Sequence, residues 1–459
     1  MTATTRDPIL DALRAGVSTV IGPDDAGYDE ARTVLYDTGS RPVAIARPAT
    51  AAEVARVVGV ARETGSELAI RSGGHSAAGH GTTDGGIVLD LAELADLDID
   101  RDAGTVWAGT GLTAGEVGRA LAEHGLVVGF GDTASVGIGG LTSGGGIGYL
   151  VRKLGLTIDN VLAAELVTAD GNVRLVDAEH DPDLFWAVRG GAGNVGVVTR
   201  FQYRLHVLPG IVGGMLILPA TPDTVAGFIA AAEAAPDHLS TIANVMPLPP
   251  MPFAPVERHG ELVILAMLAY AGPPEEAEAV IAPFRSLAEP IADMVRPSGY
   301  MDLFPPEDPD YHPVAASRTM FLDHVDRAVA ARIVETLTEH ARSTNAQMVV
   351  TQLRALGGAM ARVPVDATAF AHRGSRIMAS VAALVASREE LPEHEAWVGR
   401  YAEALEQSDR GRYVNFLGDE GPDAVGRAFP GETGRRLAAI KRRYDPTNVF
   451  RRNQNVGPA

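Results

Sequence analysis

The chain has 459 residues, of which 46% are hydrophobic and 21% are charged, so it can supply two or three domains with separate cores. Lys and Arg number 39 against 58 Asp and Glu, and this net charge of −19 disfavours binding to nucleic acids or anionic membrane surfaces. The absence of Cys excludes disulfides, thiolate nucleophiles and Cys-ligated metal clusters. The N-terminus has no apolar signal region and no segment is long enough to span a bilayer, so we expect a cytoplasmic protein.

The first part of the sequence alternates short helices, short strands and glycine-rich turns. A helix is predicted over 9–20, and Thr50 is placed to cap a second helix over 51–63 that carries valines on one side. This mixture is typical of an α+β fold class. The other predicted elements are strands at 42–48, 68–71, 86–91, 105–108 and 197–205 and helices at 114–124 and 182–189.

The composition changes near residue 209, after which Pro, Ala and Met become frequent. Apolar strands predicted at 262–268 and 347–353 are separated by segments with helical periodicity. An antiparallel sheet with helices on one face is therefore expected in the middle of the chain. Its helices are predicted near 274–287, 325–342 and 390–407.

The first of three glycine clusters, Arg71-Ser-Gly-Gly-His-Ser-Ala-Ala-Gly79, directly follows a predicted strand. Two glycines in a tight turn let backbone N–H groups converge on an anion, because no Cβ blocks the approach. A lone turn histidine is usually structural, but the glycines and serines around His75 favour a functional role.

The second cluster, residues 129–148, has Gly at nine of its twenty positions. The alternative of a flexible linker is disfavoured because apolar residues interleave with the glycines, as expected of a compact loop lying against a flat ligand. The third cluster contains a literal G-x-G-x-x-G at Gly191, Gly193 and Gly196, but a helix is predicted before it and a strand after it. That order is the reverse of a Rossmann site. The clusters together indicate a dinucleotide-sized cofactor held by the loops of a non-Rossmann domain.

Several longer motifs resemble the FAD-linked oxidases of the vanillyl-alcohol oxidase (p-cresol methylhydroxylase) superfamily, in the berberine-bridge-enzyme-like branch and near its 6-hydroxy-D-nicotine oxidase type. The motifs are RSGGHSAAGH, SVGIGGLTSGGGIGYLVRKLGLTIDNV, PDLFWAVRGGAGNVGVVT, GGAMARVPVDATAFAHR and KRRYDPTNVFRRNQNV. The resemblance implies an FAD-binding domain of the p-cresol methylhydroxylase type at 1–208, a substrate-binding domain at 209–409 and a C-terminal segment, 410–459, that returns to the FAD domain.

The resemblance also assigns roles to residues. His75 matches the histidine that bonds covalently to the flavin 8α-methyl, and Thr133 stands where many relatives carry a Cys for a second link, so a single 8α-histidyl link is expected. Tyr413 and Asn415 are expected beside the isoalloxazine and the substrate. The remaining cofactor positions are Arg71, Ser72, Gly73, Gly74, Ser76 and Gly79 in the first loop, Ser135, Gly137, Gly139 and Gly140 at the diphosphate, Gly144, Gly145 and Gly148 along the cofactor, and Gly196 and Val198 at the adenine end.

The resemblance implies two catalytic positions. Val136 occupies the position that gates oxygen, and valine there resembles the oxygen-reactive members. Tyr413 is the first candidate for the base, with Arg318 or Arg354 as a cation that could lower its pKa. Phe416 replaces a second tyrosine that the family often has, which weakens any scheme with two tyrosines, and an amine substrate could react without a base.

The leading hypothesis is an FAD-dependent oxidase that takes a hydride from a small alcohol, sugar or amine and passes electrons to molecular oxygen, giving H2O2, as a monomer or homodimer. The alternatives are a tailoring enzyme of secondary metabolism, either an oxidative cyclase or a dehydrogenase, and a flavin or ligand-binding protein without catalysis. Candidate substrate-lining residues in the middle block are Met267, Tyr270, Met320 and Gln352, although core packing is the more common role for each methionine.

Overall fold

A small sheet near the N-terminus has strand order β1-β2-β4-β3, in which β2, β4 and β3 run parallel. The structure is a computed structural model and describes residues 7–36, 38–308 and 310–459. Helix α3 makes the crossover between β2 and β3, and the Thr50 hydroxyl accepts the Glu53 N–H at its start, which confirms the predicted cap. The elements are α1 (Pro8–Arg14), β1 (Thr19–Ile21), α2 (Tyr28–Arg32), β2 (Ala44–Arg47), α3 (Ala51–Thr64), β3 (Leu68–Arg71) and β4 (Ile87–Asp90).

The predicted helix over 9–20 is wrong in its second half. Helix α1 ends at Arg14, and the chain then forms β1 as an antiparallel partner of β2. Gly16 weakens helix continuation, and the Thr19-Val-Ile21 stretch is rich in β-branched residues that fit a pleated strand.

The second sheet is antiparallel, with strand order β5-β6-β10-β8-β9. The third glycine cluster lies between α7 and β10, which confirms that it is not a Rossmann turn. The elements here are β5 (Leu97–Asp100), β6 (Thr105–Gly109), α4 (Ala114–Ala122), α5 (Ile138–Gly144), α6 (Val151–Leu154), η1 (Thr157–Asn160), β8 (Val161–Val167), β9 (Val173–Asp177), α7 (Pro182–Val188) and β10 (Val197–Arg204), with β7 (Leu126–Val127) and β11 (His206–Val207) forming a separate pair.

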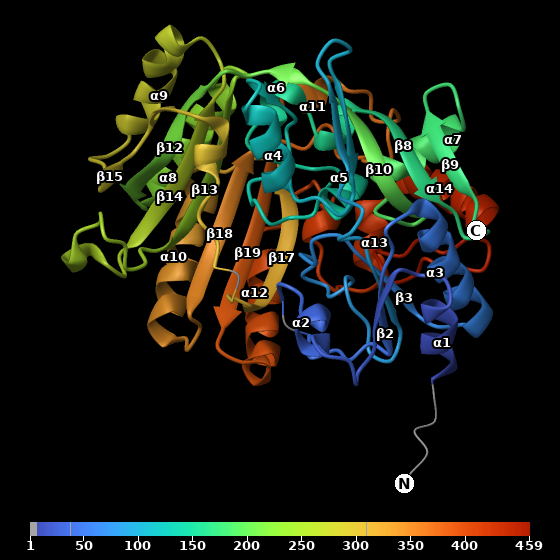
Figure 1. Ribbon diagram of the computed structural model, residues 1–459. Coiled ribbons are helices and arrows are strands. Elements are labelled where there is room, and N and C mark those ends of the chain that lie inside the picture. Colours follow the sequence, from blue (N-terminus) through green and yellow to red (C-terminus); the bar gives the residue numbers. More distant parts are fainter. Residues whose placement is uncertain (1–6, 37, 309) are drawn as a thin grey trace.

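The middle of the chain forms an eight-stranded antiparallel sheet of order β15-β12-β14-β13-β18-β19-β17, with β16 pairing β12. As predicted, helices cover one face, and residues of α8, α9, α10 and α12 share a core with alternate strand residues (Figure 1). The strands are β12 (Ile211–Pro219), β13 (Leu239–Pro247), β14 (Leu262–Tyr270), β15 (Ala292–Asp293), β16 (Arg296–Ser298), β17 (Val314–Leu322), β18 (Met348–Ala355) and β19 (Ile377–Val385). The helices are α8 (Pro222–Ala234), η2 (Val256–Arg258), η3 (Pro274–Glu276), α9 (Ala277–Arg285), η4 (Tyr300–Leu303), α10 (Arg327–Ser343), α11 (Ala359–Arg362), η5 (Arg388–Glu390) and α12 (Leu391–Leu405).

The C-terminal segment returns to the N-terminal half, and in Figure 1 the red C-terminal segment lies beside the blue helix α3. It contains η6 (Val414–Phe416), α13 (Pro422–Ala428) and α14 (Gly431–Tyr444). Val449 and Phe450 pack into the core of the small sheet. The opposite face of the large sheet, called the helix-free face here because α8, α9, α10 and α12 do not cover it, packs against residues of the second glycine cluster and against Tyr413. Within the described ranges, no helix is both long and apolar enough to cross a lipid bilayer.

Candidate active site

The first glycine loop follows β3 and exposes a row of unpaired backbone donors. The N–H groups of Gly73, Gly74, His75 and Ser76 have no hydrogen-bond acceptor among the residues that the structure describes. Gly74 lies in the left-handed region at φ 72°, a backbone conformation typical of turns whose successive N–H groups bind an anion. Such a concave set of donors suits a phosphate or another anion.

The second glycine cluster is more ordered than the loop predicted from sequence, because it contains the short helix α5. The cluster packs closely on the first loop: a side chain at Gly73 would overlap the backbone of Gly137, and a side chain at Gly137 would overlap that of Gly73. The Ser72 hydroxyl donates to the Thr110 carbonyl at 2.5 Å and accepts the Gly139 N–H at 3.2 Å. These glycines are therefore needed for contact between the two loops.

Asn415 fastens the C-terminal segment to α5. Its amide donates to the Leu141 carbonyl at 2.9 Å and to the Tyr413 hydroxyl at 3.0 Å, and its side chain fills the space that a Cβ at Gly144 would need. The structure thus brings Tyr413, Asn415 and Gly144 together, as the sequence analysis expected.

Tyr413 is buried, with its hydroxyl oxygen surrounded by N–H donors. The backbone N–H groups of Gly146 and Ile147 donate to it at 2.9 and 3.3 Å, in addition to Asn415. Burial raises the pKa of Tyr413, whereas these donors and the positive charge of Arg354 act to lower that pKa. Of the two arginines considered from sequence, Arg354 acts on Tyr413, while Arg318 pairs with Glu420 at 3.5 Å.

His75 projects from the first loop toward the second. Its Nε2 lies 2.9 Å from the Ser135 hydroxyl, and that hydroxyl and the Ser135 N–H both reach the Glu307 carboxylate, at 2.7 and 2.9 Å. Burial lowers the pKa of His75, so its imidazole is neutral near pH 7. Glu307 was not found from sequence, and its only sequence signal is an acidic residue after two prolines.

Three further expected residues have protein neighbours that define their environment. The Arg71 guanidinium is buried and donates to Asp90 and to the Ala31 carbonyl at 2.8 and 2.6 Å, so it anchors the start of the first loop. Ser76 accepts the His80 N–H. Val136 is half-buried against the core that joins α4, α5 and the second sheet.

The remaining expected residues lie in the same loops or strands: Gly79 ends the first loop, Thr133 is half-buried, Gly140 is exposed, Gly145 faces Tyr413, Gly148 packs on the Phe130 backbone, and Gly196 and Val198 lie at the start of β10 beside β8.

The helix-free face of the large sheet carries a polar network toward the second glycine cluster. Arg354 is 5% exposed and pairs with Asp132 at 2.7 Å, and its Nε donates to Gln352. Gln352 donates in turn to Asn244 at 2.9 Å. Ser380 of β19 lies opposite Gln352 of β18, so uncharged polar side chains continue onto the next strand of this face.

One of the four candidate lining residues, Tyr270, is wrong, and Met320 takes the core-packing role that is the more common one for a methionine. Tyr270 and Met320 are almost fully buried in the core on the helix-covered face of the sheet. Met267 and Gln352 lie on the opposite face. Asn244, Ser380 and Asp132 were not predicted, although a lone Asn among apolar residues of a strand is a signal that could have identified the first of them.

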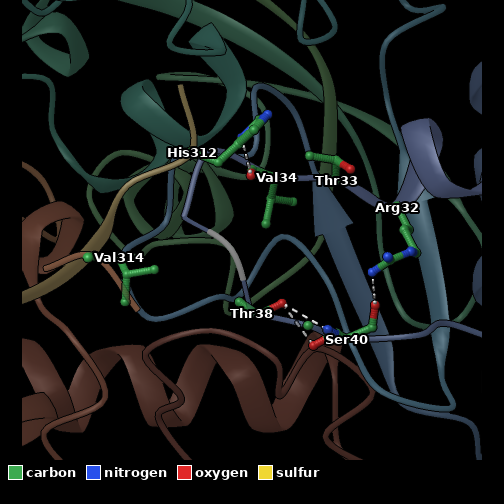
Figure 2. A pocket seen from close by; sticks show the side chains of 9 residues that line it. Arg32, Thr33, Val34, Thr38, Ser40, His312 and Val314 are labelled. Atoms are coloured by element: carbon green, nitrogen blue, oxygen red, sulfur yellow. Dashed lines mark hydrogen bonds between the residues drawn. The ribbon is translucent and has the colours of Figure 1, made fainter. Parts of the chain in front are cut away.

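Two cavities lie near the first loop. One, of about 380 Å³, is lined by residues that include Val34, which packs on Gly74, and His312, whose Nδ1 lies 3.1 Å from the Val34 carbonyl (Figure 2). The other, of about 230 Å³, includes Gly79 and the end of the loop. Next to it, both ring nitrogens of His80 are buried without a hydrogen-bond partner among the described residues. Unpaired loop N–H groups, an orphaned imidazole and adjoining cavities fit a large phosphate-bearing cofactor.

Comparisons with known proteins agree with this geometry. Residues 42–177 match the family "FAD binding domain" and residues 412–457 match "Berberine and berberine like". The (R)-6-hydroxynicotine oxidase of Paenarthrobacter nicotinovorans is 30% identical over 96% of each chain, and berberine bridge enzyme-like C-1 of Nicotiana tabacum is 29% identical over 91% of this chain and 85% of that protein.

Solved structures show the same fold. The 6-hydroxy-D-nicotine oxidase from Arthrobacter nicotinovorans superimposes with a TM-score of 0.87 at 27% identity, covering 96% of this chain and 98% of that one. The xylooligosaccharide oxidase from Myceliophthora thermophila gives a TM-score of 0.85 at 24% identity, covering 99% and 100%. The chain is therefore an FAD-dependent oxidoreductase that belongs to the berberine-like family.

Proposed function

We propose that this enzyme is an oxidase that carries FAD on a single covalent link from His75 and oxidises a small, neutral, hydroxylated substrate, reducing molecular oxygen to H2O2. The family relation supports the cofactor and the reaction class. The covalent link is supported by the position of His75, which projects from a loop of unpaired N–H donors, and by a glucooligosaccharide oxidase of the same fold that bears a 6-S-cysteinyl, 8α-N1-histidyl FAD. This chain contains no Cys, so only the histidyl link of that pair is available to it.

The observation that carries the substrate class is the row of uncharged polar groups on the helix-free face of the large sheet. Asn244, Gln352 and Ser380 are half-buried neighbours on adjacent strands, and they offer amide and hydroxyl groups that both donate and accept. Asp132 is already paired with Arg354, so its charge is compensated and less able to bind a cationic amine. Alcohols and sugars therefore fit this face better than amines do.

Different residues of the chain would hold the cofactor and act as the base. The first loop and α5 would hold the diphosphate, and Asn415 would keep the C-terminal segment against α5 beside the flavin. The flavin supplies the hydride acceptor when bound. Tyr413 remains the candidate base: Gly146, Ile147 and Asn415 direct N–H donors at its oxygen, so they would stabilise the phenolate against the cost of burial.

A substrate screen with two matched panels tests this proposal. Purified enzyme is supplied with sugars and small alcohols in one panel and with primary and secondary amines of similar size in the other, while oxygen uptake and H2O2 are recorded. We expect turnover in the first panel. Turnover confined to amines would overturn the substrate class, and flavin reduction without oxygen uptake would identify a dehydrogenase instead.

A further inference from the structure

Three residues from separate parts of the chain form a linear hydrogen-bond relay that ends at His75. Glu307 lies in the segment that follows η4, Ser135 lies just before α5, and His75 lies in the first loop. The His75 Nε2 is 2.9 Å from the Ser135 Oγ, which is 2.7 Å from the Glu307 Oε1. The second carboxylate oxygen accepts the Ser135 N–H at 2.9 Å, so Glu307 holds the serine at two points.

The protons in this relay have one arrangement. An ionised carboxylate only accepts hydrogen bonds, and a serine hydroxyl has one proton to donate. Ser135 therefore donates to Glu307 and accepts from His75, so the proton of the neutral imidazole sits on Nε2. The Nδ1 of His75 is left with its lone pair, which is the form of the ring that can act as a nucleophile.

We propose that Glu307 and Ser135 are positioning residues that select the Nε2–H tautomer of His75 and so direct its Nδ1 to the 8α-methyl carbon of FAD. This inference rests on the covalent link in the proposed function. Attachment forms the bond between Nδ1 and the 8α carbon, releases one proton from that methyl group and one from Nε2, and passes two electrons to molecular oxygen, which becomes H2O2.

The relay also gives the imidazole proton a path away from the ring. As Nδ1 bonds to carbon, positive charge develops on the ring and the Nε2 proton becomes acidic. Ser135 can accept that proton while passing its own to Glu307, and Glu307 is exposed and can release a proton to water. The same carboxylate stabilises the developing positive charge.

The chain offers a matched control for Glu307. Asp308 is also acidic and exposed and lies in the same segment, but its carboxylate accepts the Asp310 N–H and takes no part in the relay. Asp308→Asn thus removes one negative charge next to the relay without breaking it. Ser135→Thr keeps a hydroxyl at the central position and serves as the conservative variant for Ser135→Ala.

The experiment uses full-length protein produced under riboflavin limitation and then supplied with FAD in air. Total bound flavin is measured by absorbance, and the covalent fraction is followed over time by flavin fluorescence after denaturation and by intact mass. We expect Glu307→Gln and Ser135→Ala to bind FAD but to form the covalent link about 100-fold more slowly, as for the loss of a positioned proton acceptor. Asp308→Asn and Ser135→Thr should form the link at nearly the rate of the unchanged chain.

Other outcomes are decisive as well. Normal attachment in Glu307→Gln would overturn the relay, and so would a loss of total FAD binding in either relay variant, because these residues would then hold the cofactor itself. A chain that binds FAD but never forms a covalent link, even without substitution, would instead refute the covalent link of the proposed function.

Discussion

The side of the molecule proposed to bind the cofactor and the side proposed to bind the substrate are built from different contacts. Around the first glycine loop and α5, backbone packs on backbone, as where Gly73 meets Gly137, and the unpaired N–H groups are the groups that would bind the cofactor. The helix-free face of the large sheet works through side chains, with Arg354, Gln352 and Asn244 linked in series. Positions where backbones touch must be glycine, whereas single substitutions in a side-chain network can change which ligand groups it binds.

The difference explains why the cofactor could be inferred so much more firmly than the substrate. Backbone N–H groups bind the phosphates that every FAD carries, so the glycines that allow this contact can be recognised in a single sequence. The side chains on a sheet face are chosen for one substrate, and nothing in their local sequence says what they bind. The following substitutions test the backbone contacts and the side-chain contacts separately.

The largest effect is expected at Lys441, which holds the C-terminal segment on the cofactor side. Lys441 and Asp445 have no exposed side-chain surface and form an ion pair at 3.2 Å, while the ammonium also donates to the Asn194 and Phe450 carbonyls. Lys441→Met leaves the Asp445 charge buried without its partner, which should cost about 3–5 kcal/mol in the free energy of unfolding. Urea unfolding measures the loss, with the exposed Arg442→Met as control. Equal stability of the two variants would contradict a structural role for the pair.

Gly73 tests the backbone contact itself. In Gly73→Ala the new Cβ overlaps the backbone of Gly137, and separating the two loops should destabilise the protein by about 1–3 kcal/mol and weaken FAD binding. Gly140→Ala is the matched control for stability, because no atom lies within 4 Å of its Cβ position. If both alanine variants unfold at the same urea concentration, the close approach of the loops does not limit stability.

The local parts of the fold could be predicted from sequence, and the long-range parts could not. The cap at Thr50 and the strands around the glycine clusters depend on neighbours within a few residues. The strand at Thr19–Ile21 depends on its partner β2, so local periodicity extended α1 too far. The helix α5 was missed because glycine has low helix propensity, and packing between loops overrides that preference.

The site shows the same division. His75, Asn415 and Tyr413 belong to compact motifs; in the structure His75 contacts Ser135 of the second glycine cluster, and Asn415 bonds Leu141 of α5 and the Tyr413 hydroxyl. Glu307 and Asp132 contact partners that are 172 and 222 residues away in sequence, and a single sequence holds no record of such pairs. Tyr270 was assigned to the wrong face because the direction of strand alternation depends on which face the helices cover.

Gln352 is the corresponding test on the substrate side. Gln352→Leu removes a group that bonds both Asn244 and Arg354, so a hydroxylated substrate would lose a hydrogen-bonding partner. We expect kcat/KM to fall about 10- to 100-fold with unchanged flavin content. Gln347→Leu makes the same chemical change at an exposed position just before β18 and should leave kcat/KM close to its original value. A loss of flavin in Gln352→Leu would show that this sheet face also serves the cofactor.

The smallest effect is expected at Val136, in the second glycine cluster just before α5. Val136 is half-buried, and its carbonyl accepts the Ala114 N–H at 2.8 Å, which fixes the backbone and leaves only the size of the side chain to vary. If the valine leaves oxygen a path to the reduced flavin, Val136→Leu narrows that path. Oxidation of the flavin by oxygen should then slow severalfold, a cost below about 1.4 kcal/mol, while anaerobic reduction by substrate stays nearly constant.

Stopped-flow absorbance of the flavin follows the two half-reactions separately, so this test does not depend on steady-state rates. Val136→Thr is the control for side-chain size, because threonine is β-branched with as many heavy atoms as valine and should keep oxygen access. Slowing of both half-reactions in Val136→Leu would place the residue in the substrate chamber. No slowing of either would remove Val136 as the gate, and the preference for an oxidase over a dehydrogenase would then depend on the family relation alone.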